Sequence, residues 1–313
     1  MAGNTFLTMQ EIAEEALATL YESTPMHGLV HTDLTSQFST KAKGNTIDIR
    51  VPAVFQSNRF VRANGIQLQD ATETAIPVVV SDIADVSVGV TDEDMTLNIK
   101  DFSTQLLNPM MEAIAQDIDQ SLLAMRDNVT QVAGFGTAAT ANGETWDQPE
   151  VLIEAGRQLD LASVPLQDRF AVVGPTTKAR WLNSDIIKHA EKSGSTAALR
   201  EGSIGKNLFG FDAFQTGNVG QPAGTPASGE PTTEIGLAFH KTAFAFGSAP
   251  LQLPAGANVG QVAVVSYKGL SIRISYGWDI NKKQTVLSAD MLFGTKLLDA
   301  NRAVLLKGAN ATV

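Results

Sequence analysis

The 313-residue sequence contains no cysteine, so disulfide bonds, thiolate nucleophiles and cysteine-based metal sites are excluded. No apolar run reaches the roughly 18 residues that a membrane-spanning helix needs. Residues 1–10 lack the basic patch and apolar core of a signal peptide, so we expect no membrane partner. Positive charge is also missing from the beginning of the chain, where the first basic residue is Lys41.

The composition is that of a globular protein, with 43% hydrophobic and 18% charged residues. Its length allows one large domain or two small ones. The formal net charge of −10 argues against binding nucleic acid by general neutralisation of phosphates. Residues 268–307 nevertheless hold seven basic and three acidic residues, so opposite ends of two copies could attract each other; ordinary solvated faces are the alternative.

Two segments have helical periodicity. A capping box at Thr8–Glu11 opens a helix that Pro25 ends. A longer helix is predicted over residues 103–132, because apolar residues recur at alternating steps of four and three from Met111 to Val132. It would span on the order of 45 Å. A coiled coil and a spine packed on a sheet both fit this repeat, and we favour the spine because paired charges do not flank it.

A long hairpin is predicted in the first quarter of the chain. Residues 47–51 alternate between apolar and polar, which indicates a strand, and residues 75–80 form a second one in which Pro77 favours an edge or an exposed ribbon. Residues 55–74 between them are polar and charged. Because two strands alone are marginally stable, we expect this hairpin to lie on another surface, such as a second subunit.

The rest of the chain mixes helices and strands, which predicts an α+β fold whose sheets draw strands from distant parts of the sequence. The predicted strands cover residues 86–90, 95–99, 170–173, 211–215, 235–246, 270–276 and 303–306, and the predicted helices cover residues 147–159 and 176–191. Residues 216–233 are rich in Gly, Pro, Ser and Thr and are predicted to form a loop.

Three motifs with potential chemistry fit their contexts poorly. Gly134–Ala139 matches the dinucleotide pattern G-x-G-x-x-A, but a predicted helix precedes it where a strand is needed. Asp92–Asp94 lacks the other acids and the glycine of a calcium loop. His27 and His31 have the spacing of two metal ligands on a helix, yet Pro25 disfavours a helix there. We therefore predict no catalytic residue, cofactor or metal site; a metal- or nucleotide-dependent enzyme is the alternative from another class.

Several short segments follow one another in a particular order: Phe6–Thr8, Leu17–Leu20, Leu29–Asp33, Gly44–Pro52, Leu97–Phe102, Ala115–Asp119, Leu159–Pro165, Arg169–Pro175, Gly205–Thr216 and Ala238–Ala245. In this order they resemble the major capsid (coat) proteins of tailed bacteriophages, especially the podophage-like coat family. The resemblance covers most of the chain, and the order of the segments carries it rather than any single motif.

This resemblance implies the Hong-Kong-type capsid fold. In that fold an N-terminal arm precedes an extended hairpin loop, a peripheral domain carries a long spine helix, and an axial domain lies at the centre of each capsomer. The corresponding ranges here are the arm at 1–43, the hairpin loop at 44–80, the peripheral domain at 81–146 with its spine at 103–132, the axial domain at 147–258 and the closing peripheral strands at 259–313. Larger relatives carry an inserted domain, which we do not expect in this chain.

The resemblance also implies a structural role, without enzymatic activity or a cofactor. Copies of the chain would assemble as hexamers and pentamers into an icosahedral virion shell around packaged double-stranded DNA, after synthesis and assembly in the host cytoplasm. The acidic arm agrees with packaging by other proteins, because a coat that condenses its own genome typically needs a basic arm. Implied partners are a portal protein, optional decoration proteins and a separate scaffolding protein, since the segment before Gly44 is too short for a fused scaffold. Sequence-specific binding of nucleic acid is not expected.

The hairpin supplies the candidate inter-subunit contacts, which are its charged residues Arg50, Arg59, Arg62, Asp70 and Glu73. Some relatives join their subunits through a lysine–asparagine bond made from this loop. No lysine occurs between Gly44 and Ile99, so we expect a non-covalent shell. The shell of a cellular nanocompartment with a protein cargo is the runner-up within the same fold.

Overall fold

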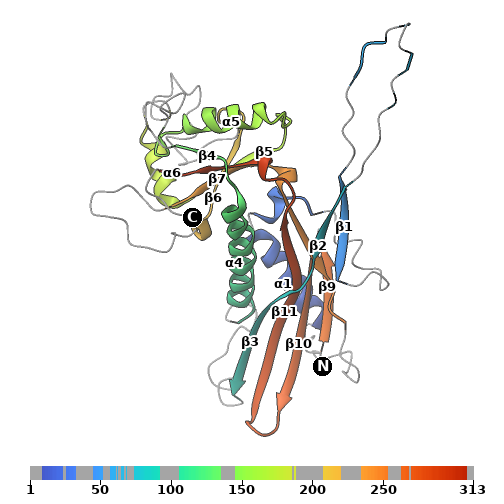
Figure 1. The fold of residues 1–313 in the computed structure, drawn as a ribbon. Coiled ribbons are helices and arrows are strands. Elements are labelled where there is room, and N and C mark those ends of the chain that lie inside the picture. The colour runs from blue at the N-terminus through green and yellow to red at the C-terminus, as the bar shows by residue number, and fades with distance from the viewer. Residues whose placement is uncertain are drawn as a thin grey trace.

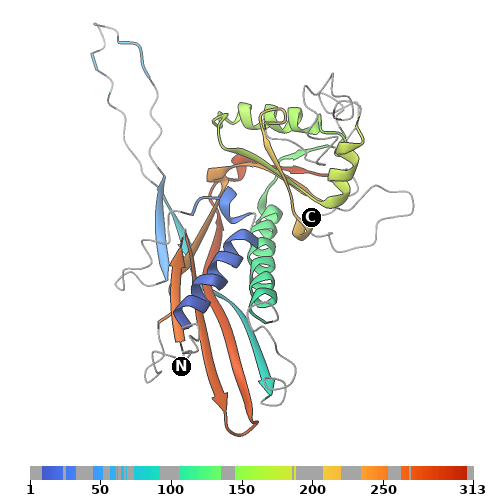
Figure 2. The same ribbon diagram turned by 180° about the vertical axis from the view of Figure 1, so that it is seen from behind.

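The structure is a computed structural model that describes residues 9–23, 26–32, 45–51, 57–60, 62, 65–66, 68, 74–91, 106–134, 145–184, 187, 207–219, 234–252, 262–267 and 269–308. These residues form two β-sheets with helices packed on them and a separate two-stranded ribbon (Figures 1 and 2). The predicted α+β class is confirmed. No helix in these segments is both long and apolar enough to cross a membrane.

The first sheet is antiparallel and is built around a long central strand. Its strands are β3 (Asp82–Thr91), β8 (Phe244–Ala249), β9 (Val262–Tyr267), β10 (Leu270–Asp279) and β11 (Gln284–Leu297). Along one edge β11 pairs with β3, and along the other edge it pairs first with β10 and then with β8. Strand β9 follows beyond β10. The sequence reasoning predicted β10 but not β11.

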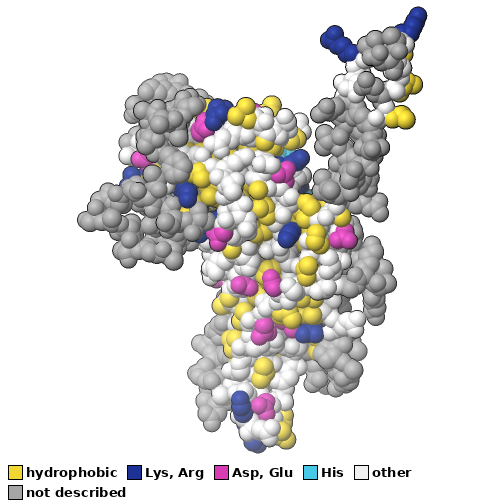
Figure 3. All heavy atoms as spheres, in the orientation of Figure 1, with side chains coloured by type: hydrophobic (Ala, Val, Ile, Leu, Met, Phe, Trp, Pro, Cys, Tyr) yellow, Lys and Arg dark blue, Asp and Glu magenta, His cyan; other side chains and the backbone are white. Residues whose placement is uncertain are grey.

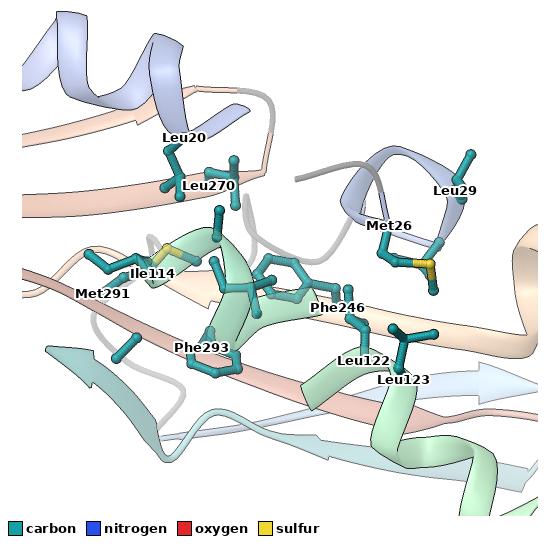
Figure 4. Packing of buried hydrophobic residues seen from close by; sticks show 14 of the residues in the cluster. Leu20, Met26, Leu29, Ile114, Leu122, Leu123, Phe246, Leu270, Met291 and Phe293 are labelled. Atoms are coloured by element: carbon teal, nitrogen blue, oxygen red, sulfur yellow. The ribbon is translucent and has the colours of Figure 1, made fainter. Parts of the chain in front are cut away.

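Two helices cover one face of this sheet (Figures 1 and 2). Helix α1 (Met9–Ser23) packs on β9 and β10, α4 (Asn108–Ala124) packs on β3 and β11, and the two helices touch each other. The short turn η1 (His27–Leu29) follows α1. Figure 4 shows apolar side chains of these helices and strands meeting in one core, among them Leu20, Ile114, Phe246 and Phe293.

The spine helix is shorter than predicted. Helix α4 ends at Ala124, residues Met125–Asn128 form the 3-10 turn η3, and an extended chain follows. Its 17 residues span about 26 Å. Val129 is buried and continues the apolar spacing, but its φ of −93° and ψ of 124° are those of an extended residue. The spacing therefore overextended the predicted helix, because a buried extended segment follows the turn. Residues 103–105 lie outside the described residues.

The second sheet is mixed and has the order β4-β12-β7-β5-β6. Its strands are β4 (Val132–Ala133), β5 (Arg169–Val173), β6 (Asp212–Gln215), β7 (Gly236–His240) and β12 (Ala303–Leu306). Helix α5 (Val151–Leu161) packs on β4 and β12. Helix α6 (Pro175–Leu182) ends at the capping residue Asn183, within the predicted 176–191; Ile187 is again helical, and residues 185–186 and 188–191 lie outside the described part.

Three strands belong to sheets that the expected ranges did not anticipate, and the first is β4, which lies within the expected peripheral range 81–146 but joins the second sheet. The predicted strand 235–246 is in fact two strands, because the turn η5 (Lys241–Ala243) interrupts it and the Nδ1 atom of His240 accepts a hydrogen bond from the Thr242 N–H at 3.2 Å. Strand β7 before this turn joins the second sheet, and β8 after it joins the first. Strand β12, within the closing segment 259–313, also lies in the second sheet.

Candidate inter-subunit surfaces

The ribbon of β1 (Thr46–Val51) and β2 (Thr74–Val79) confirms the predicted antiparallel hairpin. Pro77 lies opposite Asp48 in this ribbon. Proline has no N–H to donate to a neighbouring strand, and a two-stranded ribbon tolerates this because no third strand among the described residues pairs with β2. Beyond the ribbon, the described residues of the segment 57–68 project far from both sheets (Figures 1 and 2). Such a projection gains little stability from its own subunit, because two strands bury little surface.

The described part of the projecting segment exposes large apolar side chains. Phe60 is 67% exposed, Ile66 is 82% exposed and Leu68 is 93% exposed. Figure 3 shows apolar and cationic side chains gathered at the far end of the projection. Apolar side chains clustered at an exposed end are typical of a surface that another molecule covers. We call the described residues of 57–68 the hairpin tip.

The five predicted contact residues have different outcomes. Arg59 and Arg62 are exposed on the hairpin tip, as a contact with another subunit would require. Arg50 lies in β1 opposite Ala75, and its side chain is outside the described residues. Asp70 and Glu73 are also outside them. Their role in contacts between subunits stays a prediction. The sequence reasoning looked for charges and missed the exposed apolar residues beside them.

The end of the ribbon opposite the hairpin tip is packed on the first sheet, which together with the second sheet and the helices we call the body. Val78 of β2 is fully buried against Ala245 of β8, and the partly buried Ile49 and Leu298 pack around this pair. Within the ribbon itself, the Val80 N–H donates to the carbonyl oxygen of Asn45 at 2.8 Å. The ribbon is therefore anchored at one end by buried contacts, whereas the hairpin tip at the other end is exposed.

Two further surfaces expose large apolar side chains. At the hairpin between β10 and β11, Trp278 is 51% exposed and Ile280 is 67% exposed. On the second sheet's side of the molecule, Leu161 at the end of α5 is 75% exposed and Leu166 is 74% exposed. The sequence reasoning named neither surface. The end of the β10 alternation at Trp278, followed by Lys282 and Lys283, was an available signal for an exposed turn.

Two buried ionisable groups are Asp119 on α4 and His27 in η1. Burial raises the pKa of Asp119 on α4 to about 6, although hydrogen bonds from the Asn218 side chain and the Met26 backbone favour its charged form. The Asn218 bond to Asp119 Oδ2 measures 3.3 Å. Burial lowers the pKa of His27 to about 4, against a hydrogen bond with the Gly269 backbone. Asp119 thus links α4 to the chain after α1 and to η4 (Gly217–Val219).

Arg126 adds a second polar contact beside Asp119, at the junction where the end of α4 meets η4 and the chain before β7. Its Nη1 atom donates to the carbonyl oxygen of Val219, next to Asn218, and to that of Ile235 at 3.4 Å. Arg126 lies seven residues after Asp119, so both side chains leave the same side of the helical segment. The junction is therefore polar at its centre, with the buried Val219 and Ile235 packed beside it.

The motifs tested for chemistry gain no support from the described residues. Within these residues no group of three or more His, Asp or Glu side chains could hold a metal ion. His27 is buried and stacks edge-on against Phe246, with 5.2 Å between the ring centres, which is typical of a core residue. Gly134 follows β4, while residues 135–139 and Asp92–Asp94 lie outside the described segments.

The two sheets, the paired helices and the projecting ribbon together form the fold of phage capsid proteins, which solved capsid structures share with this chain over most of its length. The fold expected from the resemblance is thereby confirmed. No protein-family model matches the sequence, and no significant match is found among curated proteins.

Individual solved structures match nearly the whole chain. A structure from Mycobacterium phage Che8 is similar with a TM-score of 0.65 and 19% identity, covering 100% of this chain and 96% of that chain. The capsid of the cyanophage P-SCSP1u is similar with a TM-score of 0.63 and 18% identity, covering 99% and 92%. A virus-like particle from Pyrococcus furiosus is similar with a TM-score of 0.51 and 10% identity, covering 95% and 98%.

Proposed function

We propose that this chain is the major capsid protein of a tailed bacteriophage and that its copies assemble into an icosahedral shell. The observation that carries the proposal is the ribbon, which is anchored on the body and ends in an exposed tip with Phe60, Ile66 and Leu68. The fold shared with phage capsids supports the same conclusion. In this proposal a neighbouring copy covers the hairpin tip, and the shell needs no catalytic residue or cofactor.

The expected domain roles carry over to this proposal, except that three strands change domain. Residues 44–80 act as the extended loop, the first sheet with α4 forms the peripheral domain, and the second sheet forms the axial domain. Strand β8 then belongs to the peripheral domain, whereas β4 and β12 belong to the axial domain, in keeping with their sheets. Hexamers and pentamers, a scaffolding protein, a portal protein and decoration proteins are partners in this proposal.

Changing Leu68 tests the contact directly. Burial of a leucine side chain contributes about 2 kcal/mol, so Leu68→Asp should weaken each contact by roughly 30-fold. We expect soluble, folded subunits that no longer form shells in negative-stain micrographs when they are expressed together with the scaffolding protein. Leu68→Met keeps the apolar surface and is the matched control. Normal shells from Leu68→Asp would exclude the hairpin tip as a contact.

The cationic residues of the hairpin tip allow a second test. Arg59→Glu and Arg62→Glu reverse charges that, in this proposal, meet acidic groups of a neighbour, whereas Arg59→Lys keeps the charge. The reversals should reduce shell yield, with the larger loss at low salt, because screening weakens such pairs as salt rises. Deleting residues 56–72 should abolish shells altogether. Wild-type subunits that remain monomeric at high concentration with the scaffolding protein would contradict the proposed function itself.

The enclosed cargo distinguishes the phage capsid from the nanocompartment, which the similarity to the Pyrococcus furiosus particle favours as the second candidate. Shells isolated from the native source should contain double-stranded DNA if the first proposal holds, and a protein cargo if the second does. In either case a denaturing gel should show monomer bands alone, because no lysine lies between Gly44 and Ile99 to form a cross-link from the loop.

A further inference from the structure

Where the chain passes from β2 to β3, its backbone lies directly over Gly294 of the central strand β11. The pairing of β11 with β3 ends at Phe293 and Asp82. At the next residue, Gly294, an added Cβ atom would lie 2.9 Å from the Val79 carbonyl carbon and 2.9 Å from the Val80 Cα, and closer still to the Val79 carbonyl oxygen. The two backbones therefore touch here without any side chain between them.

We propose that Gly294 is a positioning residue that sets the direction in which the ribbon leaves the body. Val78 is the neighbouring anchor, because it is fully buried against Ala245. Together the glycine and this anchor form a seat that is two residues long. A seat of this kind fixes an angle only if the backbone is allowed to lie flat on it, which a side chain at position 294 would prevent.

The size of the effect follows from the geometry of a strand. Carbon atoms in ordinary contact are about 3.5–4.0 Å apart, so alanine at position 294 would lift β2 by on the order of 1 Å. Lifting one end of a seat about 7 Å long tilts the ribbon by roughly 8° about the anchored Val78, which moves Ala75, three residues or about 10 Å from that pivot, by about 1.4 Å. The hairpin tip lies farther out and moves more (Figure 1).

The consequence for shells rests on the proposed function, but the angle itself can be measured on isolated subunits. The absence of cysteine allows two spin labels to be placed at chosen sites. Ala75→Cys in β2 and Asn281→Cys in the turn after β10 are both exposed positions. Pulsed electron paramagnetic resonance then gives the distance between the two spin labels, one on the ribbon and one on the first sheet, in the unassembled subunit.

Gly294→Ala should shift the most frequent label distance by about 1.4 Å, while the circular dichroism spectrum keeps its native shape. The matched control is Gly277→Ala in β10, because an added Cβ atom there meets nothing within 4 Å, and it should leave the distance unchanged. An unshifted distance in folded Gly294→Ala would overturn the proposal.

Two further measurements distinguish a failure of the proposal about Gly294 from a failure of the proposed function. The labelled protein without the substitution should give one narrow distance distribution, and a broad one would overturn the proposal even if Gly294→Ala does not fold. In a scaffold-assisted assembly assay, Gly294→Ala should also lose shell yield relative to Gly277→Ala. Normal shells despite a shifted distance would leave the role of Gly294 intact and would contradict the proposed contact of the hairpin tip instead.

Discussion

Replacing Asp119 with asparagine should stabilise the unassembled subunit at neutral pH and change how its stability depends on pH. Asp119 is fully buried on α4, and burial raises its pKa from the usual 3.8 to about 6. Its Oδ2 atom accepts from Asn218, while no hydrogen-bond partner for Oδ1 lies within the described residues. Asparagine keeps an oxygen that can accept the same bond but carries no charge to bury.

The magnitude and the sign of the change in stability follow from the pKa values of Asp119 in the unfolded and the folded chain. A pKa that is 3.8 in the unfolded chain and about 6 in the folded one corresponds to about 3 kcal/mol. Above pH 6 the carboxyl is ionised in both states, so folding carries the full cost. As the pH falls from about 6 towards 4, the folded state takes up the proton first and stability is gained. The advantage of Asp119→Asn should therefore shrink by about 3 kcal/mol over this range.

The pH dependence of the wild-type stability would not reveal the contribution of Asp119 on its own. Burial lowers the pKa of His27 from 6.5 to about 4, so the unfolded chain binds that proton first and stability is lost as the pH falls over nearly the same range. The two contributions oppose each other. Only the difference between wild type and Asp119→Asn isolates the carboxyl, because His27 is present in both proteins.

Urea unfolding between pH 4 and pH 8, followed by tryptophan fluorescence on dilute subunits, measures this difference. The matched control is Asp117→Asn, since Asp117 is exposed on the same helix, and it should stay within about 0.5 kcal/mol of wild type at every pH. A stability difference between wild type and Asp119→Asn that does not change with pH would refute the reasoning.

Three further substitutions have defined outcomes. His27→Gln should remove the loss of stability as the pH falls from 6.5 towards 4, about 3 kcal/mol, measured by the same urea series. Glu234 accepts from the Thr177 N–H at 3.0 Å and caps α6, so Glu234→Gln should cost about 1–2 kcal/mol, measured as a lower urea midpoint. Arg169 is buried and donates to the Val164 carbonyl at 2.7 Å, so Arg169→Met should cost about 3 kcal/mol and lower the melting temperature, whereas an unchanged melting temperature would contradict its anchoring role.

Periodicity predicted the elements that have one buried face. The alternation over residues 270–276 identified β10, and the hairpin of β1 and β2 was found in the same way. Strand β11 was not predicted, because Asp290 and Gly294 interrupt the apolar pattern of its sequence. The structure explains both residues: Asp290 pairs with Arg273 of β10, and Gly294 is covered by the crossing backbone of β2. These are long-range contacts, which a local pattern does not contain.

Of the candidate contact surface, the sequence predicted only the location. The polar segment between two strands correctly indicated an exposed projection, and Arg59 and Arg62 are exposed on it. The exposed Ile66 and Leu68 were missed because single apolar residues in a polar segment have no periodicity. How strongly such residues are exposed depends on how far the ribbon extends from the body, and that follows from the tertiary structure.

The order in which the strands are made has a consequence for protein synthesis. Strand β11 lies inside the first sheet and β12 lies inside the second, between β4 and β7. Both emerge from the ribosome after every strand they pair with, so neither sheet can close while the chain is still short. A fragment released early would lack both inner strands and could not hold the ribbon at its seat. Only copies whose translation has passed residue 306 would therefore contain both complete sheets and the seat of the ribbon.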